Sequence, residues 1–148
     1  MYLSENFTLE ELLASQVAER HGIDNRPPPG PVFTNLVLLC QHLERVRDLL
    51  GGRPMLITSG YRCRALNTLI GGSRHSAHMA GRAADFICPQ FGPPRDICER
   101  IAIDDRDFDQ LIYEGSWVHL AIDRDYPRRE VLTAQFRDGG VTYSEGLA

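Results

Sequence analysis

Residues 76–85 read Ser76-Ala77-His78-Met79-Ala80-Gly81-Arg82-Ala83-Ala84-Asp85. The polar segment 73–81 predicts a loop that carries two histidines, and the apolar segment 83–88, which ends before Pro89, predicts a strand. Upstream of this stretch apolar residues recur every three or four positions, as in helices, whereas short strands predominate downstream. Helices followed by strands favour an α+β fold, with an antiparallel sheet and the N-terminal helices packed on one side.

The N-terminal part of the chain predicts two helices. Thr8 and Glu11 form a capping box, which starts a helix that we expect to run to about Arg20. The stiff proline-rich segment 26–31 then separates it from a second helix. One apolar stripe defines that second helix, and its members are Val32, Leu36, Leu39, Leu43, Val46 and Leu50.

The remaining elements follow from changes in period and from turn residues. Gly115-Ser116 fits a type II′ turn, which would join two of the expected strands as a hairpin. The expected strands are Met55–Thr58, Ala83–Cys88, Phe108–Glu114, Trp117–Asp123, Val131–Phe136 and Val141–Tyr143, and the expected short helices are Cys63–Ile70 and Arg95–Ile103.

The composition excludes several classes of protein. The 148 residues are 43% hydrophobic and 24% charged, which is typical of a globular chain, and the length predicts one domain, 1–148. A net charge of −4 argues against nucleic acid as a partner. No apolar run approaches the roughly 20 residues of a membrane span, and the first residues lack the features of a secretory signal. We therefore expect a protein that is made without a signal peptide and does not insert into membranes, and we further expect a monomer.

Three residues have side chains of the types that bind zinc. His78 and Asp85 are separated by six residues, and His119 lies on the expected hairpin. Two imidazoles and one carboxylate leave a fourth position for water, which is the catalytic rather than the structural pattern of zinc sites.

The hairpin indicates which carboxylate could act as a base beside such a site. If Glu114 pairs with Trp117, then Ile112 lies opposite His119, and alternation puts these four side chains on one face. Glu114 is then a diagonal neighbour of His119. The other face would be core, formed by Tyr113, Val118, Leu120 and Ile122.

Each candidate also has a purely structural interpretation. A single histidine on a strand is more often a hydrogen-bonded structural residue, Asp85 could cap a strand end, and Glu114 could be an ordinary hairpin residue. The residues alone leave these alternatives open.

Two motifs resemble those of a known family. Residues 76–85 fit the pattern S-x-H-x-x-G-x-A-x-D, and residues 117–119 fit W-x-H about forty residues later. Together with Ile57–Arg62, Asn67 and Gly71-Gly72, they resemble the zinc D-Ala-D-Ala carboxypeptidase family of peptidoglycan-cleaving metallopeptidases, which includes phage endolysins. The likeness extends from about Leu3 to Asp123 and implies the fold shared by the hedgehog signalling domain and the DD-peptidases.

The resemblance implies a role for each of several residues. It implies His78, Asp85 and His119 as zinc ligands, and Arg62 as a donor of hydrogen bonds to the scissile carbonyl oxygen. It further implies that Ser76 contacts the substrate backbone and that Trp117 forms a wall of the site; the structural alternatives are a turn that holds the His78 loop for Ser76, and core packing for Trp117.

One position departs from the family pattern. The acidic base of the well-characterised branches lies three residues before the second histidine, where this chain has Ser116. Serine cannot act as that base, so we assign the role to Glu114, the nearest carboxylate.

These motifs favour a zinc peptidase that hydrolyses a bond in peptidoglycan stem or cross-bridge peptides, as a D,D- or L,D-type carboxypeptidase or endopeptidase. Such an enzyme would act on the cell wall, for example in phage lysis. The alternative is a zinc-stabilised module of the same fold without catalytic activity, such as a component of a phage particle.

Overall fold

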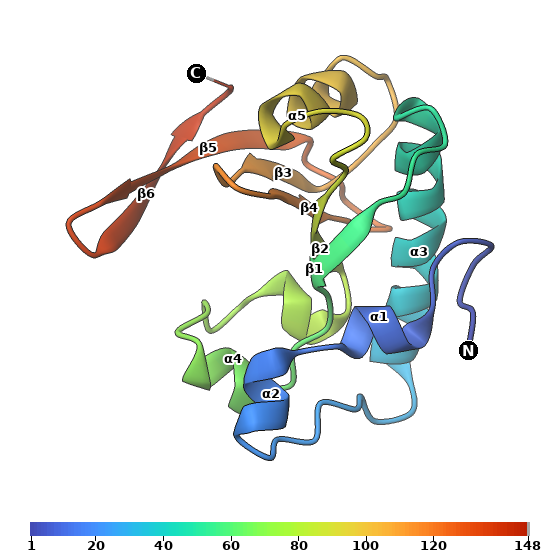
Figure 1. The fold of residues 1–148 in the computed structure, drawn as a ribbon, viewed down its shortest axis with the longest axis vertical. Helices are drawn as coiled ribbons and strands as arrows, with labels where there is room; N and C mark the ends of the chain where they lie inside the picture. Colours follow the sequence, from blue (N-terminus) through green and yellow to red (C-terminus); the bar gives the residue numbers. More distant parts are fainter. Residues whose placement is uncertain (148) are drawn as a thin grey trace.

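The computed structural model describes residues 1–147 and contains short helices, one long helix and a single sheet (Figure 1). Among the described residues, no helix is both long enough and apolar enough to cross a membrane. The elements are, in chain order, α1 (Leu9–Leu13), α2 (Gln16–Arg20), α3 (Pro31–Leu49), β1 (Leu56–Ser59), α4 (Arg64–Leu69), the 3₁₀ helix η1 (Ala77–Ala80), β2 (Ala83–Ile87), α5 (Pro94–Ala102), β3 (Gln110–Tyr113), β4 (Val118–Ala121), β5 (Glu130–Arg137) and β6 (Gly140–Glu145).

The sheet has six strands in the order β1-β2-β4-β3-β5-β6. The prediction of an α+β fold with an antiparallel sheet is confirmed, with one exception: β5 pairs with β3 in parallel. After β4 the chain turns back and passes the N-terminal end of β3. It then forms β5, which pairs with the edge of β3 that faces away from β4. The crossing segment is tied down by backbone hydrogen bonds from Arg129 to Phe108 and from Glu130 to Asp109.

The helices α3 and α5 and the sheet share one hydrophobic core. The predicted stripe is buried except at Val32, which is partly buried, and it packs with Ile97 and Ile101 of α5 against side chains of the sheet. Phe86 and Leu120 project into this core from β2 and β4. Residues that alternate with them on the same strands must project to the opposite face, which leaves that face of the sheet available for other uses.

The predicted helix from Thr8 to Arg20 is wrong in its length, because the chain forms two short helices there. The capping box of Thr8 and Glu11 is present, but the backbone becomes extended at Ala14. The carbonyl oxygen of Leu12 accepts a hydrogen bond from the backbone N–H of Tyr61 at 2.8 Å, so it is engaged by a distant segment. Ser15 then caps α2 through its side chain.

The register of the β3–β4 hairpin agrees with the prediction. Ile112 lies opposite His119, and Tyr113 lies opposite Val118. The turn at the tip closes differently from the expected type II′ turn, because the N–H of Ser116 bonds the carbonyl oxygen of Glu114 across Gly115.

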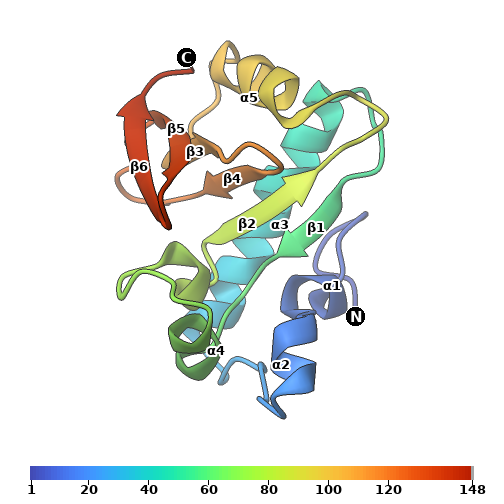
Figure 2. The same cartoon turned by 60° about the vertical axis from the view of Figure 1, so that its left-hand side comes forward.

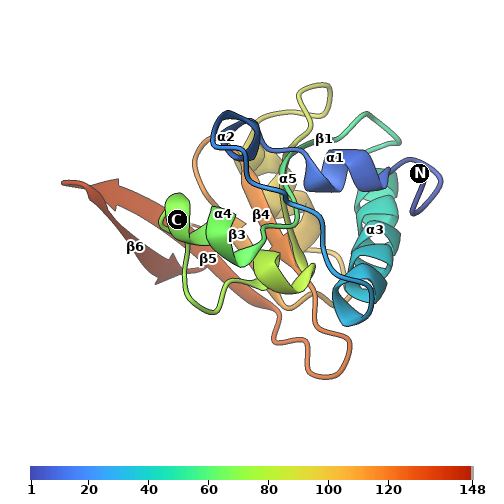
Figure 3. The same ribbon diagram turned by 90° about the horizontal axis from the view of Figure 1, so that it is seen from below.

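At the other end of the sheet, β5 and β6 form the predicted C-terminal hairpin, in longer form. It reaches away from the side of the molecule where α3 lies (Figures 1 and 3). In Figure 2 the two strands stand beside β3 and β4, above the segment that carries α4.

The register of β1 is irregular. Ile57 lies opposite Phe86, but Ser59, two residues later, lies opposite Asp85, which is only one residue away on β2. The extra residue in β1 comes just before Gly60 and Arg62, and an extra residue of this kind typically bends the strand that contains it.

Candidate metal centre and its cleft

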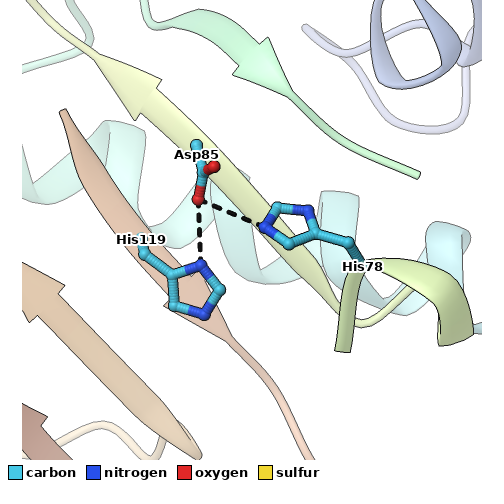
Figure 4. A group of neighbouring side chains, drawn as sticks. All are labelled: His78, Asp85 and His119. Carbon is cyan, nitrogen blue, oxygen red and sulfur yellow. Dashed lines mark hydrogen bonds and ion pairs between the residues drawn. The ribbon is translucent and has the colours of Figure 1, made fainter. Parts of the chain in front are cut away.

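His78, Asp85 and His119 lie together on the open face of the sheet. Their nearest potential ligand atoms are all within 4.8 Å of one another (Figure 4). Asp85 on β2 is directly opposite His119 on β4 in the antiparallel pair, so the sheet itself places these two side chains side by side. His78 approaches from η1, immediately before β2.

The side chain of His78 is almost completely buried, and only one of its ring nitrogens is engaged by the protein backbone. Nδ1 lies 2.7 Å from the carbonyl oxygen of Gly60, which accepts a hydrogen bond from Nδ1–H. Nε2 is buried, and the part of the chain that the structure describes offers it no hydrogen-bond partner. Nδ1–H therefore fixes the tautomer and leaves the lone pair of Nε2 directed towards Asp85, 3.3 Å away.

The loop that carries His78 is shaped by its own polar residues. The Ser76 hydroxyl accepts a hydrogen bond from the backbone N–H of His78 at 3.2 Å and caps η1. The N–H of Arg62 donates to the carbonyl oxygen of His78 at 3.2 Å, which ties the loop to the segment after β1.

Asp85 is the charged member of the cluster. Its Oδ1 lies 2.9 Å from Nδ1 of His119. Burial alone would raise the pKa of Asp85, but the hydrogen bond with His119 and the two neighbouring imidazoles outweigh it and hold the pKa well below its usual range. The carboxylate is therefore ionised at neutral pH, as a metal ligand must be.

Arg62 is held beside the cluster by a buried asparagine. Its Nη1 donates to Oδ1 of Asn67 at 3.1 Å, and Nδ2 of Asn67 donates to the carbonyl oxygen of Ser73 at 2.9 Å. A Cβ at Gly72 would overlap the amide of Asn67, so the close approach of this segment requires glycine. Burial lowers the pKa of Arg62, partly offset by Asp85 and Glu114, and its Nε is buried without a partner among residues 1–147.

Glu114 follows β3 on the same face as His119. Burial and the negative charge of Asp85 raise the pKa of the Glu114 carboxyl, while His119 and Arg62 oppose the rise. A carboxyl group with a raised pKa is well suited to exchange protons near neutral pH.

All seven residues singled out in the sequence line one open cleft of about 660 Å³. They are Arg62, Ser76, His78, Asp85, Glu114, Trp117 and His119. A volume of this order suits a short peptide or another small ligand.

The sequence interpretation missed one wall of this cleft. Leu132 of β5 and Val141 and Tyr143 of β6 also line it. The second hairpin was predicted, but no local signal indicated that it would lie beside the cleft, because this depends on the parallel pairing of β5 with β3.

The comparison with protein families agrees with this geometry. A family model described as Peptidase M15 matches residues 5–121, which include all the residues just described except the second hairpin. The chain belongs to the peptidase M15 family. This is the zinc D-Ala-D-Ala carboxypeptidase family of the sequence resemblance, and the architecture is consistent with its hedgehog/DD-peptidase-like fold. A search of curated proteins returned no match to the chain.

M15 peptidases are zinc-dependent, and the side chains of this M15 member fit a zinc ion. The fit rests on Nε2 of His78, a buried nitrogen that has no hydrogen-bond partner among the described residues. It rests also on the ionised carboxylate of Asp85 and the imidazole of His119 beside it. Nitrogen and carboxylate oxygen are both common zinc ligands.

Proposed function

We propose that this protein is a zinc-dependent peptidase that hydrolyses a peptide bond in bacterial peptidoglycan, in a stem or cross-bridge peptide of D,D or L,D type. His78, Asp85 and His119 are the proposed zinc ligands. The observation that carries the proposal is the unpartnered Nε2 of His78 directed at Asp85, in a cleft that also holds a buried arginine and a glutamate of raised pKa. Family membership supports a metallopeptidase.

A zinc ion bound there would supply Lewis acidity, which lowers the pKa of water and polarises a carbonyl group. The protein contributes the orientation of the reacting groups. Arg62 keeps one nitrogen on Asn67 and can direct its other N–H groups to the scissile carbonyl oxygen, where negative charge develops during attack.

Glu114 is the proposed general base and acid. Its carboxylate would accept a proton from the attacking water and then deliver that proton to the nitrogen of the leaving amine. The raised pKa makes Glu114 a stronger base in the first step and moves its pKa towards the working pH, which suits a group that must both accept and release a proton.

Ser76 and Trp117 complete the proposed site. The Ser76 hydroxyl is already bonded to the N–H of His78, so its structural role is plain, and its position in the cleft lets it contact the substrate backbone as well. Trp117 would form the wall beside Glu114. We place the site of action at the cell wall, as in phage lysis.

A second candidate function is a zinc-stabilised binding module without turnover. It is favoured by Ser116, which stands where the resemblance leads one to expect the acidic base. Glu114 distinguishes the two candidates, because a binding module needs no base.

The test compares wild type with Glu114→Gln on purified peptidoglycan, by measuring new amine termini and identifying the products by mass spectrometry. We expect the variant to keep its zinc content and lose about 10²- to 10⁴-fold in activity. Glu5→Gln, a change at an exposed residue, serves as the matched control. Full activity of Glu114→Gln would reject the assigned base, and wild-type protein that cleaves no muropeptide would favour the binding module.

A further inference from the structure

The β5–β6 hairpin lies outside residues 5–121, the part of the chain that the family model matches, yet it forms part of the cleft. The sheet register explains how. Leu132 pairs with Ile112, and Ile112 pairs with His119, which in turn pairs with Asp85. These side chains form one row across four strands, so Leu132 continues the face that holds the histidine and the aspartate.

The next row brings Tyr143 towards Glu114. The same register places Glu114 level with Ala134, and Ala134 pairs with Tyr143 on β6. Between the glutamate and the tyrosine there is therefore only the small side chain of Ala134, which is buried on the same face of the sheet. Val141, the next cleft residue on β6, lies on the same face.

The chemistry of Tyr143 suits a contact with a ligand. Half of its surface is exposed. Burial, with the charges of Glu114 and Asp85, raises the pKa of the phenol, so the hydroxyl remains protonated and can donate a hydrogen bond. Within residues 1–147 the hydroxyl has no hydrogen-bond partner, while the ring lies in a wall that is otherwise aliphatic.

We propose that Tyr143 is a substrate-contacting residue and that the β5–β6 hairpin sets substrate preference. The Tyr143 hydroxyl donates to a main-chain carbonyl oxygen of the bound peptide, and its ring, with Leu132 and Val141, forms a subsite for an aliphatic substrate side chain. This inference rests on the proposed peptidase function, since the ligand is the peptide that the cleft would cleave.

The first test measures kcat and KM on a peptide series in which one residue beside the scissile bond is aliphatic, acidic or basic. Tyr143→Phe should lose about 3- to 10-fold in kcat/KM through the hydroxyl. Tyr143→Ala should lose more than this, mainly by a higher KM, and should lose the preference for the aliphatic residue. Tyr126→Phe and Tyr126→Ala are the controls, because Tyr126 is exposed and lies outside the cleft.

The second test measures binding of the same peptides by calorimetry in the non-cleaving Glu114→Gln background, so that it does not depend on turnover. Weaker binding after Tyr143→Ala, with unchanged zinc content and melting temperature, supports the inference even if the wild type cleaves nothing and the proposed activity fails. Tyr143→Ala with wild-type affinity and wild-type preference would overturn it.

Discussion

Arg62 and His78 are each held by a neighbour that would not bind substrate or metal itself. Asn67 fixes one end of the Arg62 guanidinium, and the carbonyl oxygen of Gly60 fixes the tautomer of His78. Such supporting contacts keep reactive groups in position before a ligand arrives, which avoids an entropy loss during binding.

Asn67 should therefore matter for turnover although it does not line the cleft. Asn67→Ala removes the acceptor for Arg62 Nη1, and we expect kcat/KM to fall by about 10- to 100-fold, mostly in kcat, with normal zinc content. Steady-state kinetics with metal analysis tests this. Asn6→Ala is the control, because Asn6 bonds only to Glu44 among the described residues. A variant that melts early but retains wild-type kcat would assign Asn67 a structural role alone.

The raised pKa of Glu114 predicts the acid side of the pH profile. The base must be deprotonated to act, so kcat/KM rises with pH through the pKa of Glu114. Because burial and Asp85 raise that pKa above the ordinary value of 4.5, the rise should occur at a higher pH than an exposed glutamate would give. Zinc content measured at each pH separates this effect from loss of metal. A rise centred at or below 4.5 would contradict the assignment.

At the scale of elements, Asp109 anchors the crossing that leads from β4 to β5. Its carboxylate oxygens accept hydrogen bonds from Nε and Nη2 of Arg128, both at 2.9 Å, and from the Arg128 backbone N–H at 3.2 Å. The hydrogen bonds from Arg128 lower the pKa of Asp109. This contact helps to place the hairpin wall of the cleft.

Asp109→Asn should lower the free energy of unfolding by about 1 kcal/mol, a value reduced for the exposure of Arg128. Because the folded state lowers the pKa of Asp109, its contribution is present above the ordinary value of 3.8 and is lost as pH falls through the folded pKa. Urea unfolding at neutral and acid pH tests this. Asp105→Asn, at an exposed aspartate, should show no such difference, and equal curves for wild type and Asp109→Asn at pH 7 would refute it.

The elements also show what sequence patterns can and cannot predict. The α3 stripe and the β3–β4 register were predicted correctly, because helical period and strand alternation are local properties. The break at Ala14 and the parallel β3–β5 pair were missed, because a distant N–H from Tyr61 and the path after β4 decide them. The seven predicted residues line one cleft, as expected. The place of Tyr143 in that cleft was not predicted, because it depends on the parallel pairing of β5 with β3.

At the scale of the whole molecule, the two faces of the sheet have different roles. One face packs on α3 and α5, and the other presents the metal cluster. A bound ion would therefore connect η1, β2 and β4, and by mass action it should stabilise the folded state.

Zinc at about 100 times its dissociation constant should stabilise the protein by about 2.7 kcal/mol. For a chain of this size that corresponds to an increase of roughly 5–10 °C in Tm over the chelator-treated protein. His119→Ala should abolish the increase, whereas His21→Ala, at an exposed histidine outside the cleft, should keep it. Calorimetry measures both. An equal zinc response in His119→Ala and wild type would exclude His119 as a ligand.

The irregular register of β1 has a consequence for insertions and deletions. Because Ser59 rather than Thr58 lies opposite Asp85, the strand contains one residue more than regular pairing requires. Deleting Thr58 would restore a regular ladder, yet it would change the backbone that leads into Gly60, which bonds His78, and Arg62, which bonds Asn67. The number of residues in this strand is therefore as much a part of the site as the identity of its side chains.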